Sequence, residues 1–300
     1  AAGVAHSNRL PVLLISGDTF QSRVPDPVLQ QVEHFHDPTL TVNDAFKPVV
    51  RYWDRITRPE QLVHSLPHAI ATMLDPATCG PAFLALPQDV QAESFDYPDG
   101  FFDTVVHEIA RPRADTAQLR RAADVIRHAS RPLIVAGGGV HYSLAEAELA
   151  TFAEVHGIPV VETMAGKACL VASHPLNAGP VGVTGCQSAN ALAADADVVI
   201  AVGTRLQDFT TGSWTAFDAA AQFVGINAAA FDAVKHSLAP VVGDAREALT
   251  DLTPLLGDWS APAEWADRAA RETEGYHAYI DKLAAPTDAG SPGGRELPTY

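Results

Sequence analysis

The chain has 300 residues and a mass of 31.8 kDa, which is enough for one large α/β domain or two ordinary ones with buried cores. Its 36 acidic and 20 strongly basic residues give a formal net charge of -16, which repels nucleic acid backbones and anionic lipid headgroups. No apolar run could span a bilayer, no secretory signal pattern is found and the three cysteines form no CxxC pair, so we expect a cytoplasmic protein without a zinc finger or a disulfide scaffold.

The first part of the chain alternates apolar segments with polar connections. Residues 1–10 are typical of the end of a helix, and residues 11–16 predict a fully buried strand. A connection longer than ordinary structural loops follows Thr19. A helix is predicted over residues 58–73, and residues 81–86 predict a second buried strand.

The periodicity lapses over residues 96–112, where Pro98, Gly100 and Pro112 favour a linker between domains. Beyond it we expect a central domain over residues 113–257, with helices and strands in alternation, and a helix followed by a flexible linker over 258–300. The fold class is therefore α/β, with a doubly wound, Rossmann-like parallel sheet in the central domain. The expected helices there are 116–130, 144–156, 189–194 and 245–256, the strands are 132–136, 158–162, 197–202, 222–226 and 241–242, and the last helix is 263–283.

Two loops that follow strands of the central domain could approach a ligand. The first contains Gly137, Gly138 and Gly139, but Tyr142 stands where the dinucleotide fingerprint requires glycine, and glycines at a tight turn are more often structural. The second contains the residues Gly203, Thr204 and Arg205. Its arginine could hold a phosphate or pair with a surface carboxylate, and both alternatives stay open.

The segment from Glu33 to Asp37 contains the only dense group of metal-type side chains, with His34 and His36 between the two acids. Because no further ligands can be identified, a solvated loop is the simpler interpretation, and we predict no metal site. No GxSxG, HExxH or Walker A motif is present, which disfavours serine hydrolases, zinc proteases and P-loop NTPases. Lys167 is interpreted as a loop lysine, because nothing beside it in sequence would lower its proton affinity.

The chain resembles the thiamine diphosphate-dependent enzymes of the acetolactate synthase and pyruvate oxidase group. Two strand-and-turn segments in the first part and four segments in the central domain carry the resemblance, in the family's order and spacing. They are LPVLLISG at 10–17, GPAFLALPQDV at 80–90, RPLIVAGGG at 131–139, HGIPVV at 156–161, ADVVIAVGTR at 196–205 and VGDAREAL at 242–249.

Within that group, the first part is most similar to the trihydroxycyclohexanedione hydrolases of myo-inositol breakdown. The segments that carry this likeness are residues 17–20, 25–31, 33–38, 42–48, 51–55 and 85–93. The likeness implies a parent enzyme that opens the ring of trihydroxycyclohexane-1,2-dione to 5-deoxy-glucuronate. It also implies that residues 1–95 are the C-terminal part of a pyrimidine-binding domain, and that the chain is a fragment.

The resemblance implies thiamine diphosphate and Mg²⁺ as cofactors of the parent enzyme. The cofactor's thiazolium carbanion adds to a carbonyl and holds the electrons left when the neighbouring carbon–carbon bond breaks. The resemblance implies that the family's activating acid lies upstream of Ala1, and no Gly-Asp-Gly with a following Asn is present to hold magnesium and diphosphate. Gly243-Asp244-Ala245 is not that motif, because it matches the central domain's own last strand. We therefore expect the chain alone to bind the cofactor weakly or not at all and to be inactive.

Site residues follow from the same likeness and from the rule that open α/β sheets bind ligands at the carboxyl ends of their strands. We expect seven residues near the substrate or cofactor, with core or loop structure as the alternative for each. They are Gly17, Asp18, Thr19, Gln30, Gln31, Glu33 and His34. Their catalytic roles cannot be assigned.

Other functions remain open beside the ring-opening hydrolase. One is an acetolactate synthase-like lyase or oxidase, and another is a non-catalytic nucleotide-binding or structural module. Related central domains hold flavin adenine dinucleotide (FAD), but neither glycine loop keeps the full fingerprint, so we expect no FAD. The expected partners are a small cyclic diketone and further copies of the chain in a dimer or tetramer.

Overall fold

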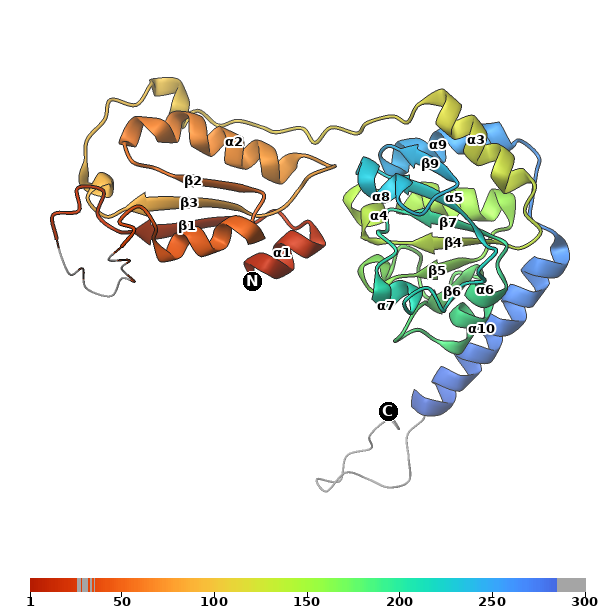
Figure 1. Ribbon diagram of the computed structural model, residues 1–300. Helices are drawn as coiled ribbons and strands as arrows, with labels where there is room; N and C mark the ends of the chain where they lie inside the picture. The colour runs from red at the N-terminus through yellow and green to blue at the C-terminus, as the bar shows by residue number, and fades with distance from the viewer. Residues whose placement is uncertain (26–27, 29–31, 33, 35, 285–300) are drawn as a thin grey trace, which may run out of the picture. The chain divides into compact units, whose positions relative to one another are not determined.

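The structure, a computed structural model, describes residues 1–25, 28, 32, 34 and 36–284. It divides into two compact units, unit 1 at Ala1–Ala110 and unit 2 at Arg111–Tyr300 (Figure 1). The division falls inside the stretch 96–112 that carries the proposed linker. Among the described residues, no helix is both long and apolar enough to cross a membrane.

Unit 1 is built on three parallel strands in the order β1-β3-β2. The strands are β1 at Leu13–Asp18, β2 at Tyr52–Arg55 and β3 at Ala82–Pro87. Helix α2 (Leu62–Leu74), which follows the 3-10 turn η2 (Pro59–Gln61), covers one face, and α1 (Ala2–Asn8) with the 3-10 helix η1 (Val42–Val49) covers the other (Figure 1). Two shorter 3-10 turns follow β3, η3 at Val90–Ala92 and η4 at Asp99–Phe102.

The central strand β3 supplies the core of unit 1 on both faces. Phe83 is 2% exposed and stacks on Phe46, with ring centroids 4.6 Å apart, whereas Leu84 packs on the opposite face. β1 is less covered than the sequence predicts. It begins at Leu13 rather than residue 11 and pairs with β3 alone among the described strands, so Ile15 remains 60% exposed. The prediction of a fully buried strand is therefore wrong for this segment.

Unit 2 contains six parallel strands in the order β6-β5-β4-β7-β8-β9. Numbered within the unit, this is the order 3-2-1-4-5-6 of doubly wound dinucleotide-binding folds, which confirms the predicted fold class. The strands are β4 at Pro132–Ala136, β5 at Val160–Glu162, β6 at Asn177–Pro180, β7 at Val198–Val202, β8 at Gln222–Asn227 and β9 at Ala239–Val242.

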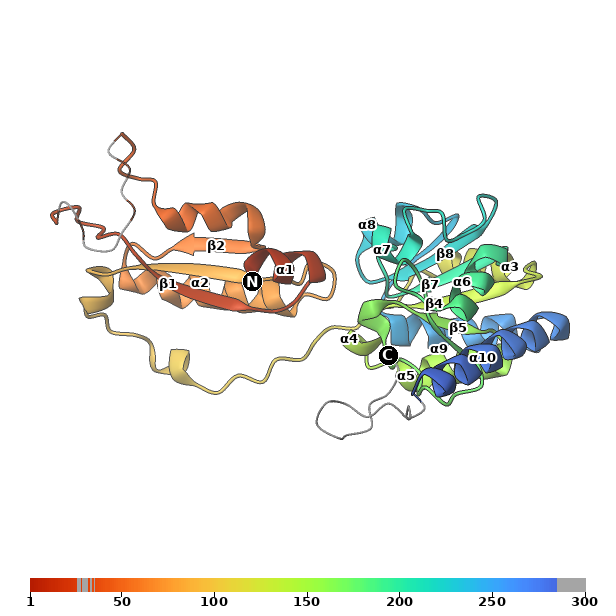
Figure 2. The same cartoon turned by 90° about the horizontal axis from the view of Figure 1, so that it is seen from below.

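Helices connect and cover these strands. α3 and α9 pack against each other, and α6 packs against α10 along β6 (Figures 1 and 2). The longer helices are α3 (Thr116–Arg127), α5 (Glu146–His156), α6 (Gln187–Asp195), α9 (Ala245–Leu256) and α10 (Ala263–Ala284), and the short ones are α4 (Gly138–Tyr142), α7 (Asp208–Thr211) and α8 (Ala230–Val234), with the 3-10 turn η5 at Met164–Gly166. The sequence predicts the bounds of each longer helix to within a few residues and does not predict the short helices.

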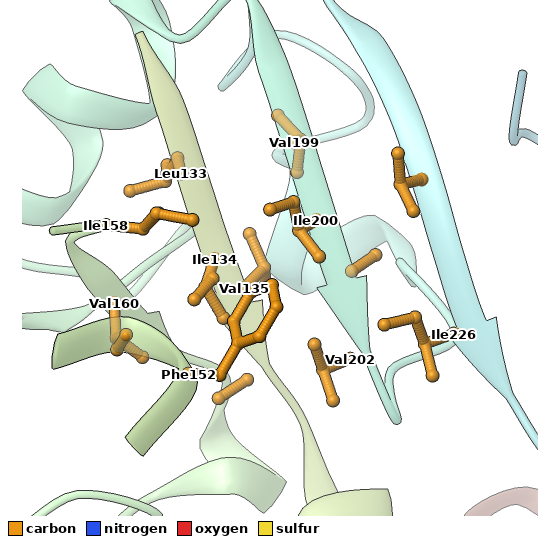
Figure 3. Close-up of a cluster of buried hydrophobic side chains, with 14 of the residues drawn as sticks. Leu133, Ile134, Val135, Phe152, Ile158, Val160, Val199, Ile200, Val202 and Ile226 are labelled. Carbon is orange, nitrogen blue, oxygen red and sulfur yellow. The ribbon is translucent and has the colours of Figure 1, made fainter. Parts of the chain in front are cut away.

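The core of unit 2 lies on β4 and β7, whose residues are all buried. Leu133, Ile134 and Val135 on β4 lie beside Ile200 on β7, with Phe152 of α5 packed over them (Figure 3). Continuous Leu, Ile and Val runs form such strands because a parallel sheet is covered on both faces. The sequence misses β6, because Asn, Gly and Pro have low strand propensity.

The stretch 96–112 is anchored at both of its ends. The Tyr97 hydroxyl donates to the Pro59 carbonyl in unit 1 at 3.0 Å. At the other end, the Pro112 carbonyl accepts from the Asp244 N–H in unit 2 at 2.8 Å. Residues 104–110 between these contacts are exposed and form no backbone hydrogen bond among the described residues.

We predict that limited digestion with a glutamate-specific protease cuts first at Glu108, because that residue is exposed and lies in the segment without backbone hydrogen bonds. Mass spectrometry of the early products should show fragments ending and beginning at this bond. Earlier cleavage between residues 131 and 205 would contradict the boundary.

Candidate functional site

The carboxyl edge of the unit 1 sheet is organised around Arg55, the last residue of β2. Its Nε donates to Asp18 Oδ2 at 2.6 Å, and Asp18 is the last residue of β1 and only 3% exposed. Its Nη2 donates to Asp44 Oδ2 at 2.6 Å and to Thr41 Oγ1 at 2.9 Å. Asp18, Thr41, Asp44 and Arg55 are called the Arg55 cluster below.

The charges of the Arg55 cluster stabilise one another. Burial alone would raise the pKa of Asp44, but hydrogen bonds from Lys47, the Thr41 N–H and Arg55 outweigh it and hold that pKa well below its usual range. Burial likewise opposes the charge of Arg55, whose pKa is nevertheless raised by its hydrogen bonds to Asp18 and Asp44. The Asp44 carboxylate and the Arg55 guanidinium are therefore ionised at neutral pH.

A third carboxylate, that of Asp89, holds the chain just after β1. The two oxygens of Asp89, which follows β3, accept from the Gln21 and Ser22 N–H groups, each at 2.8 Å. Burial raises the pKa of Asp89, but the Ser22 and Gln21 hydrogen bonds lower it by more, so the group is charged. The connection after β1 is thus fixed to the loop after β3.

The structure brings three of the expected site residues together at this edge. Gly17 accepts from Asn43 Nδ2 at 2.8 Å, and the Thr19 N–H donates to Asp18 Oδ1 at 2.8 Å. His34 is exposed, and its carbonyl accepts from the Asp37 N–H at 3.2 Å. The other three, Gln30, Gln31 and Glu33, lie outside the described residues. Their expected proximity to a ligand stays a prediction.

Arg55, Asp44 and Asp89 were missed by the sequence interpretation. Arg55 is the last residue of β2, and Asp44 lies in η1, before that strand. β2 has only four residues, two of them charged, so its sequence carries no strong strand pattern. A signal for Asp89 was available, because it follows a clearly predicted strand by two residues. Carboxylates at that position recur at functional edges of parallel sheets.

We predict that Arg55→Met lowers the free energy of unfolding of unit 1 by about 3 kcal/mol, because it leaves the buried Asp18 carboxylate without its guanidinium partner. Urea unfolding can be followed by ¹⁹F NMR of 5-fluorotryptophan at Trp53, the only tryptophan in residues 1–110. The matched control is Arg58→Met, whose side chain is 74% exposed and which should change stability by less than about 0.5 kcal/mol. Equal effects of the two substitutions would disprove the role assigned to Arg55.

In unit 2, the two glycine loops pack directly on each other. They follow β4 and β7, the neighbouring strands at which the strand order reverses, where such folds bind nucleotides. The Gly139 N–H donates to the Gly203 carbonyl at 2.9 Å. A Cβ on Gly137 would lie 2.5 Å from the same carbonyl oxygen and 2.6 Å from Thr204 Cβ. The glycines are therefore required by the contact between the loops.

The remaining residues of these loops also have protein partners. Gly138 lies against Ala165, whose Cβ would be 3.1 Å from an added Cβ. Thr204 accepts from Asn227 Nδ2 through its carbonyl at 3.1 Å, and Arg205 Nη2 donates to Gln207 Oε1 at 3.3 Å. This geometry favours the structural interpretation of both loops over the ligand-binding one.

We predict that Gly203→Ala destabilises unit 2 by about 2 kcal/mol more than Gly157→Ala. Both glycines have a left-handed backbone, with φ of +61° and +62°, so both substitutions carry similar backbone strain. An added Cβ would lie 2.6 Å from Gly139 Cα at position 203 but meets nothing within 4 Å at position 157. Thermal unfolding of the two variants measures the difference, and equal melting temperatures would show that the loops can separate freely.

A cysteine, a histidine and a glutamate lie in line beside the first glycine loop. Cys169 Sγ is 3.5 Å from His141 Nε2, and His141 Nδ1 is 2.7 Å from Glu146 Oε1. His141 Nε2 also lies 3.0 Å from the carbonyl of Lys167, whose own side chain is exposed. Burial lowers the pKa of His141, but the hydrogen bonds to Glu146 and to the Lys167 carbonyl outweigh it and raise that pKa. Nε2 thus already lies beside a carbonyl oxygen as well as beside the thiol. The arrangement does not suit a nucleophilic cysteine.

We predict that native Cys169 resists alkylation at pH 8. Burial, with smaller contributions from Glu162 and Glu146, raises its pKa from 9.0 to about 12, so the thiolate fraction falls on the order of a thousandfold. Iodoacetamide labelling followed by peptide mass spectrometry should leave Cys169 unmodified in the folded chain and label all three cysteines in guanidinium. Rapid labelling of Cys169 without denaturant would contradict its burial.

No group of three His, Cys, Asp or Glu residues in the described part of the chain has the geometry of a metal site. The carboxylates nearest to the carboxyl edge of unit 1, Asp18 and Asp44, already accept from Arg55, Thr19 and Lys47. We therefore assign no step of cofactor chemistry to these residues.

Comparison with known proteins agrees with the resemblance found in the sequence. Residues 119–252 match the family model described as thiamine pyrophosphate enzyme, central domain. The chain is also similar to proteins named 3D-(3,5/4)-trihydroxycyclohexane-1,2-dione hydrolase. It is 47% identical over 284 residues to that of Clostridium perfringens, 47% over 280 residues to that of Bacillus velezensis and 48% over 288 residues to that of Bacillus licheniformis.

These alignments cover 94%, 91% and 96% of this chain but 44%, 44% and 45% of the relatives. The chain thus spans less than half the length of the curated relatives it matches. Its matched central segment, residues 119–252, lies within unit 2 and contains β4 to β9. Residues 119–252 therefore match the central domain of the thiamine pyrophosphate enzymes, and the chain as a whole is similar to part of the relatives named above.

Proposed function

We propose that this chain is part of a thiamine diphosphate-dependent hydrolase that opens the ring of a trihydroxycyclohexane-1,2-dione to 5-deoxy-glucuronate in inositol degradation. The observation that carries the proposal is the 47% identity over 284 residues, which includes both units and not only the central domain. The likeness before residue 95 supports the hydrolase branch in particular, because a family match to the central domain alone would leave the branch open.

Within this proposal, unit 1 is part of the domain that receives the cofactor's pyrimidine, and its carboxyl edge faces the substrate. Support comes from the polar groups that converge there, since open parallel sheets bind small molecules at that edge. This chain's residues bind and orient, whereas thiamine diphosphate and Mg²⁺ in the whole enzyme supply the electron sink and the charge that binds the diphosphate.

We propose that the central domain is a structural and subunit-contact domain in a cytoplasmic homo-oligomer, rather than an FAD site. The packed glycine loops support this role, as do three exposed apolar side chains in the connections after β5, β6 and β7. Met164, Val183 and Phe209 are 72%, 62% and 45% exposed, and the Val183 N–H donates to the Phe209 carbonyl at 2.9 Å. A flavin absorbance band in the purified protein would count against this assignment.

The test of the function is a chimera. In the Clostridium perfringens relative, the matched 284 residues are replaced by those of this chain, and the product formed from the cyclic dione with thiamine diphosphate and Mg²⁺ is followed by NMR. We expect ring opening by the chimera and none by the 300-residue chain alone. A chimera that converts pyruvate to acetolactate and leaves the dione intact would assign the chain to the lyase branch instead.

A further inference from the structure

The connection between β1 and η1 is held at both of its ends by polar groups of the strand edge. At its beginning, Asp89 accepts from the N–H groups of Gln21 and Ser22. At its end, Arg55 Nη1 donates to the Thr39 carbonyl at 3.2 Å and Nη2 donates to the Thr41 hydroxyl. The two anchors come from the end of β2 and from the loop after β3, so the edge of the sheet sets where the connection begins and ends.

The Arg55 anchor continues into the connection through a chain of hydrogen bonds. Thr39 donates to Asp37 Oδ1 from its N–H at 3.1 Å and from its hydroxyl at 2.6 Å. The Asp37 N–H in turn donates to the His34 carbonyl at 3.2 Å, and the Leu40 N–H donates to the Asp37 carbonyl at 3.1 Å. A guanidinium on β2 thereby fixes two successive turns, which carry the exposed imidazoles of His34 and His36.

Apolar burial holds the described part of this connection only in part. Val24, Val32 and Leu40 are 82%, 57% and 36% exposed, whereas Phe20 and Val28 are half-buried. Charge-assisted hydrogen bonds, each stronger than a neutral one, supply the polar anchors at the two ends. Exposed residues held by half-buried charged anchors on a rigid sheet are typical of loops that contact ligands.

We propose that Arg55 and Asp89 are positioning residues of the substrate site, which hold residues 19–25 and 36–41 at the carboxyl edge of unit 1 so that polar side chains of these residues contact the ligand. The inference rests on the proposed function. The ligand class is a small molecule rich in hydroxyl and carbonyl oxygens, because imidazole and carboxylate groups can donate to and accept from such oxygens at close range.

The test uses two variants and two matched controls. Asp89→Asn keeps the shape of the side chain but weakens the two backbone hydrogen bonds, and Arg55→Lys keeps the charge but cannot reach Asp18, Asp44 and two threonines together. Asp75→Asn is the control for the first, because Asp75 also accepts from two backbone N–H groups, those of Ala77 and Thr78, in the turn after α2. Arg58→Lys is the control for the second.

Hydrogen exchange on the 300-residue chain is the first readout. We expect exchange about tenfold faster at residues 19–25 in Asp89→Asn and at residues 36–41 in Arg55→Lys, with residues 82–87 of β3 unchanged and both controls like the original chain. The second readout is steady-state kinetics in the chimera, where each variant should raise KM for the dione about tenfold, with a smaller change in kcat, and the controls should not.

Each outcome decides the matter. Unchanged exchange in both variants would show that Asp89 and Arg55 do not hold these segments in place. Faster local exchange with an unchanged KM would show that Asp89 and Arg55 stabilise the loop but do not position groups that bind the substrate. An unmodified chimera that does not open the ring refutes the proposed function and this inference with it, while the exchange data then still report separately on whether the anchors exist.

Discussion

The carboxylate of Asp18 is buried at the end of an edge strand, and the polar edge of unit 1 depends on the guanidinium that neutralises it. A buried carboxylate without a partner is unfavourable by several kcal/mol, so some cation must lie beside it. Arginine is suited to this place because its planar group has donors in several directions. Arg55 uses them for Asp18, Asp44, Thr41 and the Thr39 carbonyl at once. One side chain thus joins β1, β2 and the chain that leads into η1.

At the carboxyl edge of the unit 2 sheet, the connections are held together in a different way. There the connections after β4 and β7 meet through backbone groups, and glycine is needed because any side chain would overlap the opposite loop. The two loops therefore contact each other at the place where the strand order reverses. Each unit thus has a parallel sheet of its own. In unit 1 charged side chains meet at the carboxyl edge, whereas in unit 2 the loops after β4 and β7 meet there through backbone groups.

Much of the architecture was predictable from the sequence, for reasons that particular elements make clear. β4 and α9 were predicted with the observed bounds, because a continuous apolar run and an amphipathic helix with an aspartate N-cap leave few alternatives. β2 and β6 were missed, since one is short and charged and the other contains glycine and proline. Exposure of Ile15 could not be predicted, because it depends on which strands pair with β1 rather than on local pattern.

The contacts within the candidate site could be predicted even less well from local sequence pattern. Gly17, Asp18 and Thr19 could be named from the rule about strand ends. The partners of Gly17 and Asp18, however, are Asn43 and Arg55, which lie 26 and 37 residues away in sequence, and only the fold brings them together. The family match covers residues 119–252 in unit 2, whereas the Arg55 cluster lies in unit 1. If the central domain serves mainly as structure, its sequence reports the superfamily, and the residues that distinguish one substrate from another must lie in unit 1 or in parts of the relatives beyond the match. The Arg55 cluster and Asp89 are in unit 1, which is the unit that the branch-specific likeness covers.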